Sequence, residues 1–130
     1  MRANITIEGY RIIMKIHNMN LTPSPMEMIR EGKKTIELRL FDEKRKQISI
    51  GDIIIFTNTE NNNDLLYVKV EDLYIFDSFE ELYRKLPLSE CGYTENDIDS
   101  ASPDDMDVYY PKEKQRLHGV VGIKISTLKR

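Results

Sequence analysis

The sequence has little of several residue types on which whole classes of function depend. Its 130 residues include one cysteine, two histidines and no tryptophan. The lone Cys91 cannot form an internal disulfide, and the sequence offers no Cys/His spacing typical of zinc. Phosphate-cradling glycine loops and serine-nucleophile motifs are missing as well. We therefore expect no metal ion and no cofactor, and we interpret Cys91 as a structural thiol rather than a nucleophile.

Long hydrophobic runs are also missing. Apolar stretches such as Ile53 to Phe56 are far too short to span a bilayer, and the first residues lack the apolar segment of a secretory signal. With a single cysteine, this pattern predicts a cytoplasmic protein that has no membrane partner. The oligomeric state is not readable from the sequence.

A strong excess of positive charge is absent too. The formal net charge is −3, which argues against a protein that coats nucleic acid non-specifically, because such proteins are usually basic. The charge is nevertheless uneven, with a basic segment from Lys33 to Lys46 and an acidic one from Glu80 to Asp107. A local basic pocket remains compatible with this distribution, as do two solvated segments.

What is present indicates a globular α+β domain. A chain of 130 residues with 40% hydrophobic and 32% charged residues is large enough for one core, so we predict a single domain over residues 1–130. Alternating or β-branched stretches predict strands at 10–17, 35–40, 53–57, 65–76 and 119–126. Apolar residues at helical spacing and capping signals predict short helices at 26–31 and 79–86, with further short pieces near 105–110 and after Pro111.

The apolar strand residues are expected to share one buried core. We assign to it Ile36, Leu38, Ile55, Val68, Val70, Val121 and Ile123. The polar, turn-rich residues 88–110 are expected to form an excursion over one end of the sheet, and residues before Tyr10 a loose arm.

The most informative stretch runs from Glu31 to Leu40. A helical pattern stops at Gly32, which can adopt the left-handed conformation of a helix C′ residue. Strict alternation follows, so that Glu37 and Arg39 point the same way from one strand face, with Lys34 entering from the preceding turn. This concentration of charge beside an apolar strand favours a site for a polar or anionic ligand. Alternating charges on a strand are also typical of a solvated face.

The motif Gly32-x-Lys34-x-x-Glu37-x-Arg39 resembles the GxKxxExR signature of the ASCH domain (activating signal cointegrator homology), a relative of the PUA RNA-binding fold. The resemblance covers nearly the whole chain, because further segments follow in the expected order: Gly51-Asp52, Ser78 to Leu82, Tyr110-x-x-Glu113 and Gly119 to Ile123. It implies a small PUA-like β-barrel of five or six strands with flanking short helices.

The resemblance also implies a function. It implies binding of RNA or a nucleotide-like small molecule in a cleft over the motif, with Lys34, Glu37, Arg39, Tyr110 and Glu113 as ligand-binding residues. Tyrosine and arginine suit base stacking and phosphate contact, and a glutamate can accept a hydrogen bond from an exocyclic amine.

Two alternatives stay open. One small bacterial group of ASCH relatives resembles an amidohydrolase that deacetylates acetylcytidine through a lysine, a threonine and a glutamate, and ribonuclease activity has been proposed for others. Lys34 matches the lysine, whereas Glu37 occupies the threonine position. Lys34 and Glu37 are therefore the candidate catalytic residues, and we expect acetylcytidine deacetylation to be poor or absent. The other alternative is a protein-interaction module.

Overall fold

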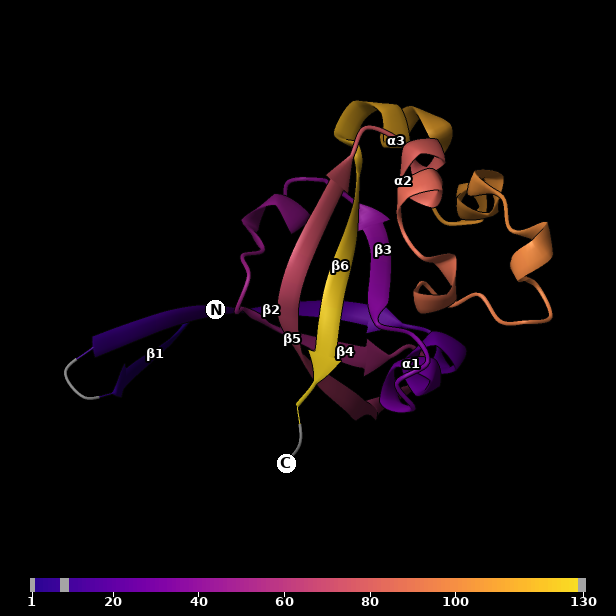
Figure 1. The fold of residues 1–130 in the computed structure, drawn as a ribbon. Coiled ribbons are helices and arrows are strands. Elements are labelled where there is room, and N and C mark those ends of the chain that lie inside the picture. The colour runs from indigo at the N-terminus through magenta and orange to yellow at the C-terminus, as the bar shows by residue number, and fades with distance from the viewer. Residues whose placement is uncertain (1, 8–9, 129–130) are drawn as a thin grey trace.

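The computed structural model describes residues 2–7 and 10–128, with side chains from residue 13 onward. Its strands form one mixed sheet in the order β1-β2-β4-β5-β6-β3 (Figure 1). The strands are β1 (Arg2–Ile7), β2 (Tyr10–Leu21), β3 (Ile36–Leu40), β4 (Ile53–Asn58), β5 (Asn61–Phe76) and β6 (Val120–Thr127). The α-helices are α1 (Pro23–Arg30), α2 (Phe79–Lys85) and α3 (Lys112–His118). Short 3-10 helices cover Arg45–Gln47, Leu88–Glu90, Ile98–Ser100 and Pro103–Val108.

The predicted α+β class is confirmed, as is the mixed sheet with flanking short helices. Strands β2 and β4 are parallel, and the other neighbouring pairs are antiparallel. Within the described residues the hydrogen-bonded ladder stays open, because β1 and β3 lie at its two ends. The predicted five or six strands are present, and in the described residues their ladder does not close into a complete barrel.

The N-terminal residues differ from the predicted loose arm. Residues Arg2–Ile7 pair with the first part of β2 as an antiparallel hairpin that extends away from the rest of the molecule (Figure 1). Residues 1 and 8–9 of this arm lie outside the described residues. Strand β2 also runs beyond its predicted end, to Leu21, because its second half pairs with β4.

Helix α1 ends as the glycine signal predicts. Gly32 has φ 77°, and its N–H donates to the carbonyl of Ile29 at 3.1 Å, while that of Lys33 donates to Met28 at 2.9 Å. These bonds close the helix and turn the chain into β3. The start of the helix lies earlier than the Ser24-Pro25 signal indicates, because Thr22 is the N-cap residue and Pro23 the first helical one.

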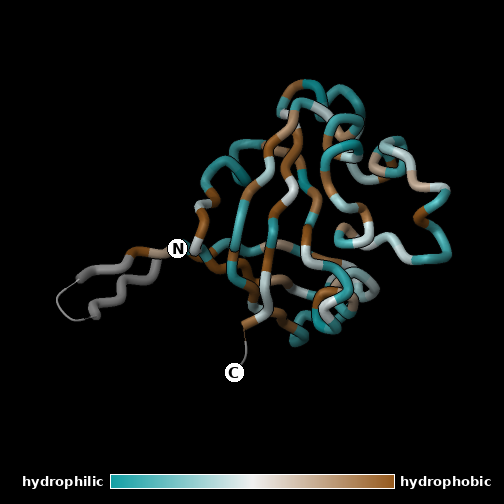
Figure 2. The backbone as a smooth tube through the Cα atoms, in the orientation of Figure 1, coloured by the Kyte–Doolittle hydropathy of each residue, from teal (hydrophilic) through white to brown (hydrophobic). Residues whose placement is uncertain are grey.

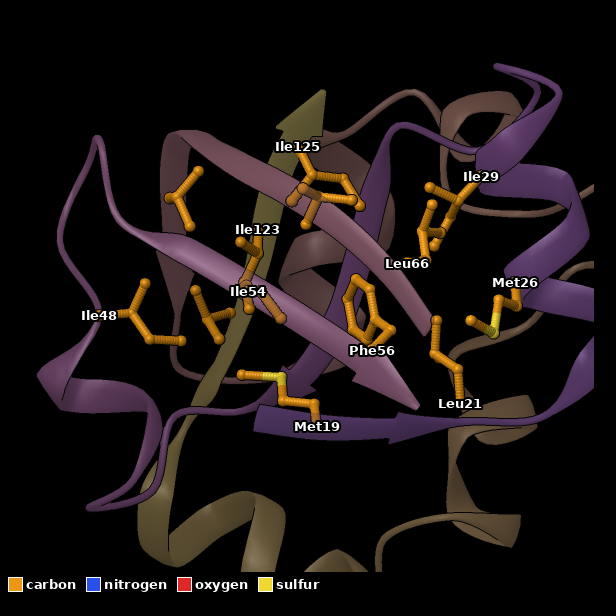
Figure 3. Packing of buried hydrophobic residues seen from close by; sticks show 13 residues of the cluster. Met19, Leu21, Met26, Ile29, Ile48, Ile54, Phe56, Leu66, Ile123 and Ile125 are labelled. Carbon is orange, nitrogen blue, oxygen red and sulfur yellow. The ribbon is translucent and has the colours of Figure 1, made fainter. Parts of the chain in front are cut away.

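The prediction of one shared core is wrong. Val68, Val70, Val121 and Ile123 belong to a cluster built around β4, β5, β6 and α1 (Figure 3). Ile36 and Leu38 belong to a second cluster with α2, and Ile55 is only half-buried. The reason is that helices cover the other face of β3 and β6 too, so neighbouring residues such as Val120 and Val121 enter different clusters. Figure 2 shows that hydrophobic positions recur along the strands of the sheet.

The pairing of β3 with β6 determines which face of the sheet carries the charged residues of β3. Glu37 lies opposite Ile123, and Arg39 lies opposite Val121, in the antiparallel pair of β3 with β6. Opposite residues share a face of the sheet, so the two charges lie on the same face as the first core cluster. A solvated strand face is thereby ruled out, and Glu37 is 4% exposed.

Candidate functional site

A pocket of about 550 Å³ lies beside the edge strand β3. One side comes from the end of β2 and from α1, including Asn20, Leu21 and Met28. The opposite side comes from the excursion, residues 88–110, and includes Cys91, Tyr93, Tyr109 and Tyr110. Lys34, Glu37 and Arg39 lie between these two walls. The volume falls within the range of about 300–1,000 Å³ typical of small-molecule sites.

Glu37 joins the two cations of the site. Its Oε1 lies 2.8 Å from Lys34 Nζ, and its Oε2 lies 2.8 Å from Arg39 Nε. The side chains of Lys34, Glu37 and Arg39 are 11%, 5% and 12% exposed. Arg39 also donates from Nη2 to the carbonyl of Asn20 at 2.8 Å, which ties β3 to the end of β2. The trio carries one more positive than negative charge.

The protonation states follow from these contacts. Burial alone would raise the pKa of Glu37, but the nearby charges of Lys34 and Arg39 outweigh it, and the pKa lies below its usual value. Burial would lower the pKa of Arg39, but the contact with Glu37 outweighs it and raises that pKa. Glu37 is therefore an anion and Arg39 a cation at neutral pH.

The excursion covers Lys34 closely. Gly92 has φ 107°, and a Cβ atom added to it would lie 3.4 Å from Lys34 Cδ. The alkyl part of the lysine side chain thus lies against the backbone of Gly92, while its Nζ reaches Glu37. Burial of the stem keeps the ammonium group in one place.

Glu90 anchors the start of the excursion to the sheet. Its backbone carbonyl accepts from the Thr35 N–H at 2.9 Å, and its Oε1 accepts from Thr35 Oγ1 at 2.7 Å. Lys124 of β6 donates to the same oxygen at 2.5 Å. These bonds lower the pKa of Glu90. The wall opposite α1 is therefore attached directly to the residue preceding β3.

Three tyrosines of the excursion line the pocket, together with Asp97 and Asp105. The Tyr83 hydroxyl lies 2.7 Å from that of Tyr93, which donates to Asp105 Oδ2 at 2.7 Å. Burial and these hydrogen bonds raise the pKa of Tyr93, and burial raises that of Tyr110. Both side chains therefore remain neutral phenols at neutral pH, and both line the pocket.

The structure brings together most of the predicted site. Lys34, Glu37, Arg39 and Tyr110 line the same pocket. Glu113 lies on an exposed position of α3 and does not line it, because the helix starts at Lys112 and presents this residue to solvent. Tyr93 and Tyr109 were not assigned to the site from the sequence, although both line the pocket. The one sequence feature that could have indicated them is the tyrosine content of an otherwise acidic excursion.

Cys91 lines the pocket but is buried, at 6% exposed. Burial raises the pKa of its thiol to about 11, so the thiol stays protonated at neutral pH and is a poor nucleophile. In the part of the chain that is described, no three His, Cys, Asp or Glu side chains are grouped to hold a metal ion. No described helix has the length and apolar character needed to cross a membrane.

The family follows from a sequence model that covers most of this architecture. The model of the ASCH domain matches residues 19–129. The chain belongs to the ASCH domain family. The match begins within β2, so the N-terminal hairpin lies before the matched residues. The predicted family is confirmed.

Solved structures agree with this assignment. The hypothetical protein PH0355 is 33% identical to this ASCH chain, with a TM-score of 0.73, and the match covers 87% of this chain and 99% of that one. Protein PF0455 from Pyrococcus furiosus is 32% identical, with a TM-score of 0.66 and coverage of 88% and 99%. ASCH from Zymomonas mobilis, 15% identical with a TM-score of 0.58 and coverage of 88% and 71%, shares the fold. No curated protein matches the chain.

Proposed function

We propose that this protein binds RNA or a nucleotide-like ligand, with one nucleotide held in the pocket beside β3. The observation that carries the proposal is the buried Lys34–Glu37–Arg39 trio on the wall of a pocket of about 550 Å³. One carboxylate shared by two cations leaves the trio itself with a net positive charge in a place that solvent reaches poorly, whereas Asp97 and Asp105 add negative charge elsewhere in the lining. An anionic ligand would offset that charge, because an uncompensated buried charge is costly.

The chemistry of the pocket suits a nucleotide better than a simple anion. The planar guanidinium of Arg39 matches a phosphate group, and Lys34 adds a second positive charge. Tyr93 and Tyr110 line the same pocket, and aromatic side chains suit a nucleobase. The family resemblance to the PUA fold points the same way.

Titration with ribonucleoside 5′-monophosphates tests the proposal. We expect saturable binding that weakens as salt rises, and we expect Lys34→Ala or Arg39→Ala to weaken it at least about tenfold. Lys33→Ala is the matched control, because Lys33 is 66% exposed, pairs with Glu31 and does not line the pocket. Equal binding by all these variants would refute the proposed site.

A hydrolase acting on a modified nucleoside or on RNA is the second candidate. The contact between Lys34 Nζ and Glu37 Oε1 favours it, since a carboxylate can take a proton from water while a neighbouring ammonium stabilises an oxyanion. Against it, both Glu37 oxygens are held by cations, and the lowered pKa makes this carboxylate a weak base.

Assays with acetylcytidine and with short RNA separate the two candidates. Turnover well above background that both Lys34→Ala and Glu37→Thr abolish would replace the binding function by a catalytic one. Binding without turnover is the outcome that we expect.

A further inference from the structure

Tyr109 stands out among the residues that line the pocket. It is 70% exposed, whereas the adjacent Tyr110 is largely covered. A tyrosine with that exposure beside a pocket offers ring surface that a bound ligand could cover, and burial of an aromatic ring is favourable.

The backbone that carries Tyr109 is firmly held. The N–H groups of Tyr109 and Tyr110 donate to the Met106 carbonyl at 3.1 and 3.0 Å. The carbonyl of Tyr110 accepts from Nε2 of Gln115 at 2.8 Å, and Gln115 is 7% exposed. The same amide group donates to Asp107 Oδ1 at 3.0 Å. A buried glutamine from α3 therefore holds the segment on both sides of Tyr109.

Ring contacts add to this support. The Tyr110 ring lies nearly parallel to that of the buried Phe79, with centroids 6.2 Å apart and an interplanar angle of 17°. The ring of Tyr109 contacts that of Tyr110, with centroids 6.4 Å apart. Tyr109 thus extends a row of aromatic rings from the second core cluster out to the pocket mouth.

We propose that Tyr109 is a stacking platform for a second nucleobase, so that the ligand is a single-stranded segment of at least two linked nucleotides rather than a free mononucleotide. This inference rests on the proposed function, in which the first nucleotide occupies the pocket. A base next to it in the strand would leave the pocket at its mouth, where Tyr109 offers an exposed ring face. Stacking on an aromatic side chain needs that face and no particular base.

Comparison of mononucleotides with dinucleotides tests this inference. The probes are AMP and CMP, and the 5′-phosphorylated dinucleotides of adenosine and of cytidine in ribose and deoxyribose forms. We expect the wild-type protein to bind dinucleotides at least about tenfold more tightly than mononucleotides, since one stacked base contributes on that order. The two sugar forms show whether the strand is RNA or single-stranded DNA.

Variants of Tyr109 test whether its aromatic ring causes the preference for dinucleotides. Tyr109→Ala should remove the dinucleotide preference, while Tyr109→Phe, which keeps the ring, should retain it. Leu117→Ala is the matched control, because Leu117 is 76% exposed on α3 and does not line the pocket. Circular dichroism of each variant checks its folding.

The outcomes separate the two proposals. Mononucleotide binding with no gain for dinucleotides would overturn the stacking role and leave the proposed function standing. A dinucleotide preference that survives in Tyr109→Ala would also overturn it. Absence of binding to both kinds of probe would refute the proposed function and this inference together.

Discussion

Lys34 Nζ lies 2.8 Å from Glu37 Oε1, where one residue comes from the turn after α1 and the other from the start of β3. Gly32, with its positive φ, turns the chain from α1 toward β3 just before Lys34, and the contact itself spans three residues. Glu37 in turn holds Arg39 by its second oxygen. The pair therefore belongs to a fixed arrangement of charges in a largely covered site, where electrostatic contacts are stronger than at the surface.

Replacement of Lys34 or Arg39 should lower both stability and ligand affinity. For exposed residues the stability change would be about 0.5 kcal/mol, but these side chains are only 11% and 12% exposed. Each substitution removes a buried charged hydrogen bond of Glu37 and leaves the other cation in place, so we expect a loss of about 1.5–3 kcal/mol in the free energy of unfolding. Urea denaturation measures it.

The comparison with ligand binding decides the role of these residues. Arg39→Lys keeps the charge but removes the planar fork, and should weaken nucleotide binding more than it weakens folding. If Lys34→Ala and Arg39→Ala lose stability while nucleotide affinity stays at the wild-type level, the trio is structural only.

The pH dependence of stability should reveal Glu37. Because its pKa in the folded protein lies below the ordinary value of 4.5 for a glutamate, its stabilising effect is complete above that value and is lost as the pH falls through the lower, folded pKa. Urea denaturation between about pH 6 and about pH 2 should therefore show a steeper acid loss for the wild type than for Glu37→Gln. Glu31→Gln, in an exposed pair with Lys33, controls for the number of carboxylates. Parallel curves for wild type and Glu37→Gln would contradict the prediction.

The strands and helices were largely readable from the sequence because their signals are local. The Ser78 cap is an example, since its side chain accepts from the N–H of Glu81 at 3.1 Å as a short-range motif predicts. The division of the core was not readable. Val121 belongs to the first core cluster and Val120 to the second. This division depends on the elements that cover each face of β6, and those elements are distant in sequence.

Only the part of the candidate site that is local in sequence could be predicted. Lys34, Glu37 and Arg39 lie within one motif, so spacing alone brings them together. Tyr93 and Tyr109 reach the pocket only because Glu90 and Gln115 hold the excursion in place. Spacing also could not show that Glu113 points to solvent, since this depends on how α3 packs.

Gly122 should be intolerant of any side chain. A Cβ atom there would lie 2.7 Å from Leu86 Cδ1 and 3.1 Å from Ile36 Cγ2. Gly122→Ala would force the Leu86 side chain or β6 to move, and we expect it to cost about 1–3 kcal/mol. Thermal denaturation measures this loss, and the double variant Gly122→Ala with Leu86→Ala should recover part of it because the close contact is removed. An unchanged melting temperature in the single variant would show that the second core cluster is looser than described.

Gly92→Ala should impair ligand binding through the wall of the pocket. At φ 107° an alanine is strained, and its Cβ would rest 3.4 Å from Lys34 Cδ, so relief of the backbone strain must move the part of the excursion that contacts the lysine. Gly51→Ala is the matched control, because Gly51 has φ 95°, has nothing within 4 Å of an added Cβ and does not line the pocket. Both variants should lose about 1–3 kcal/mol of stability from backbone strain, but we expect only Gly92→Ala to bind mononucleotides more weakly. Equal affinities in the two variants would mean that the contact between Gly92 and Lys34 does not position the ammonium group for a ligand.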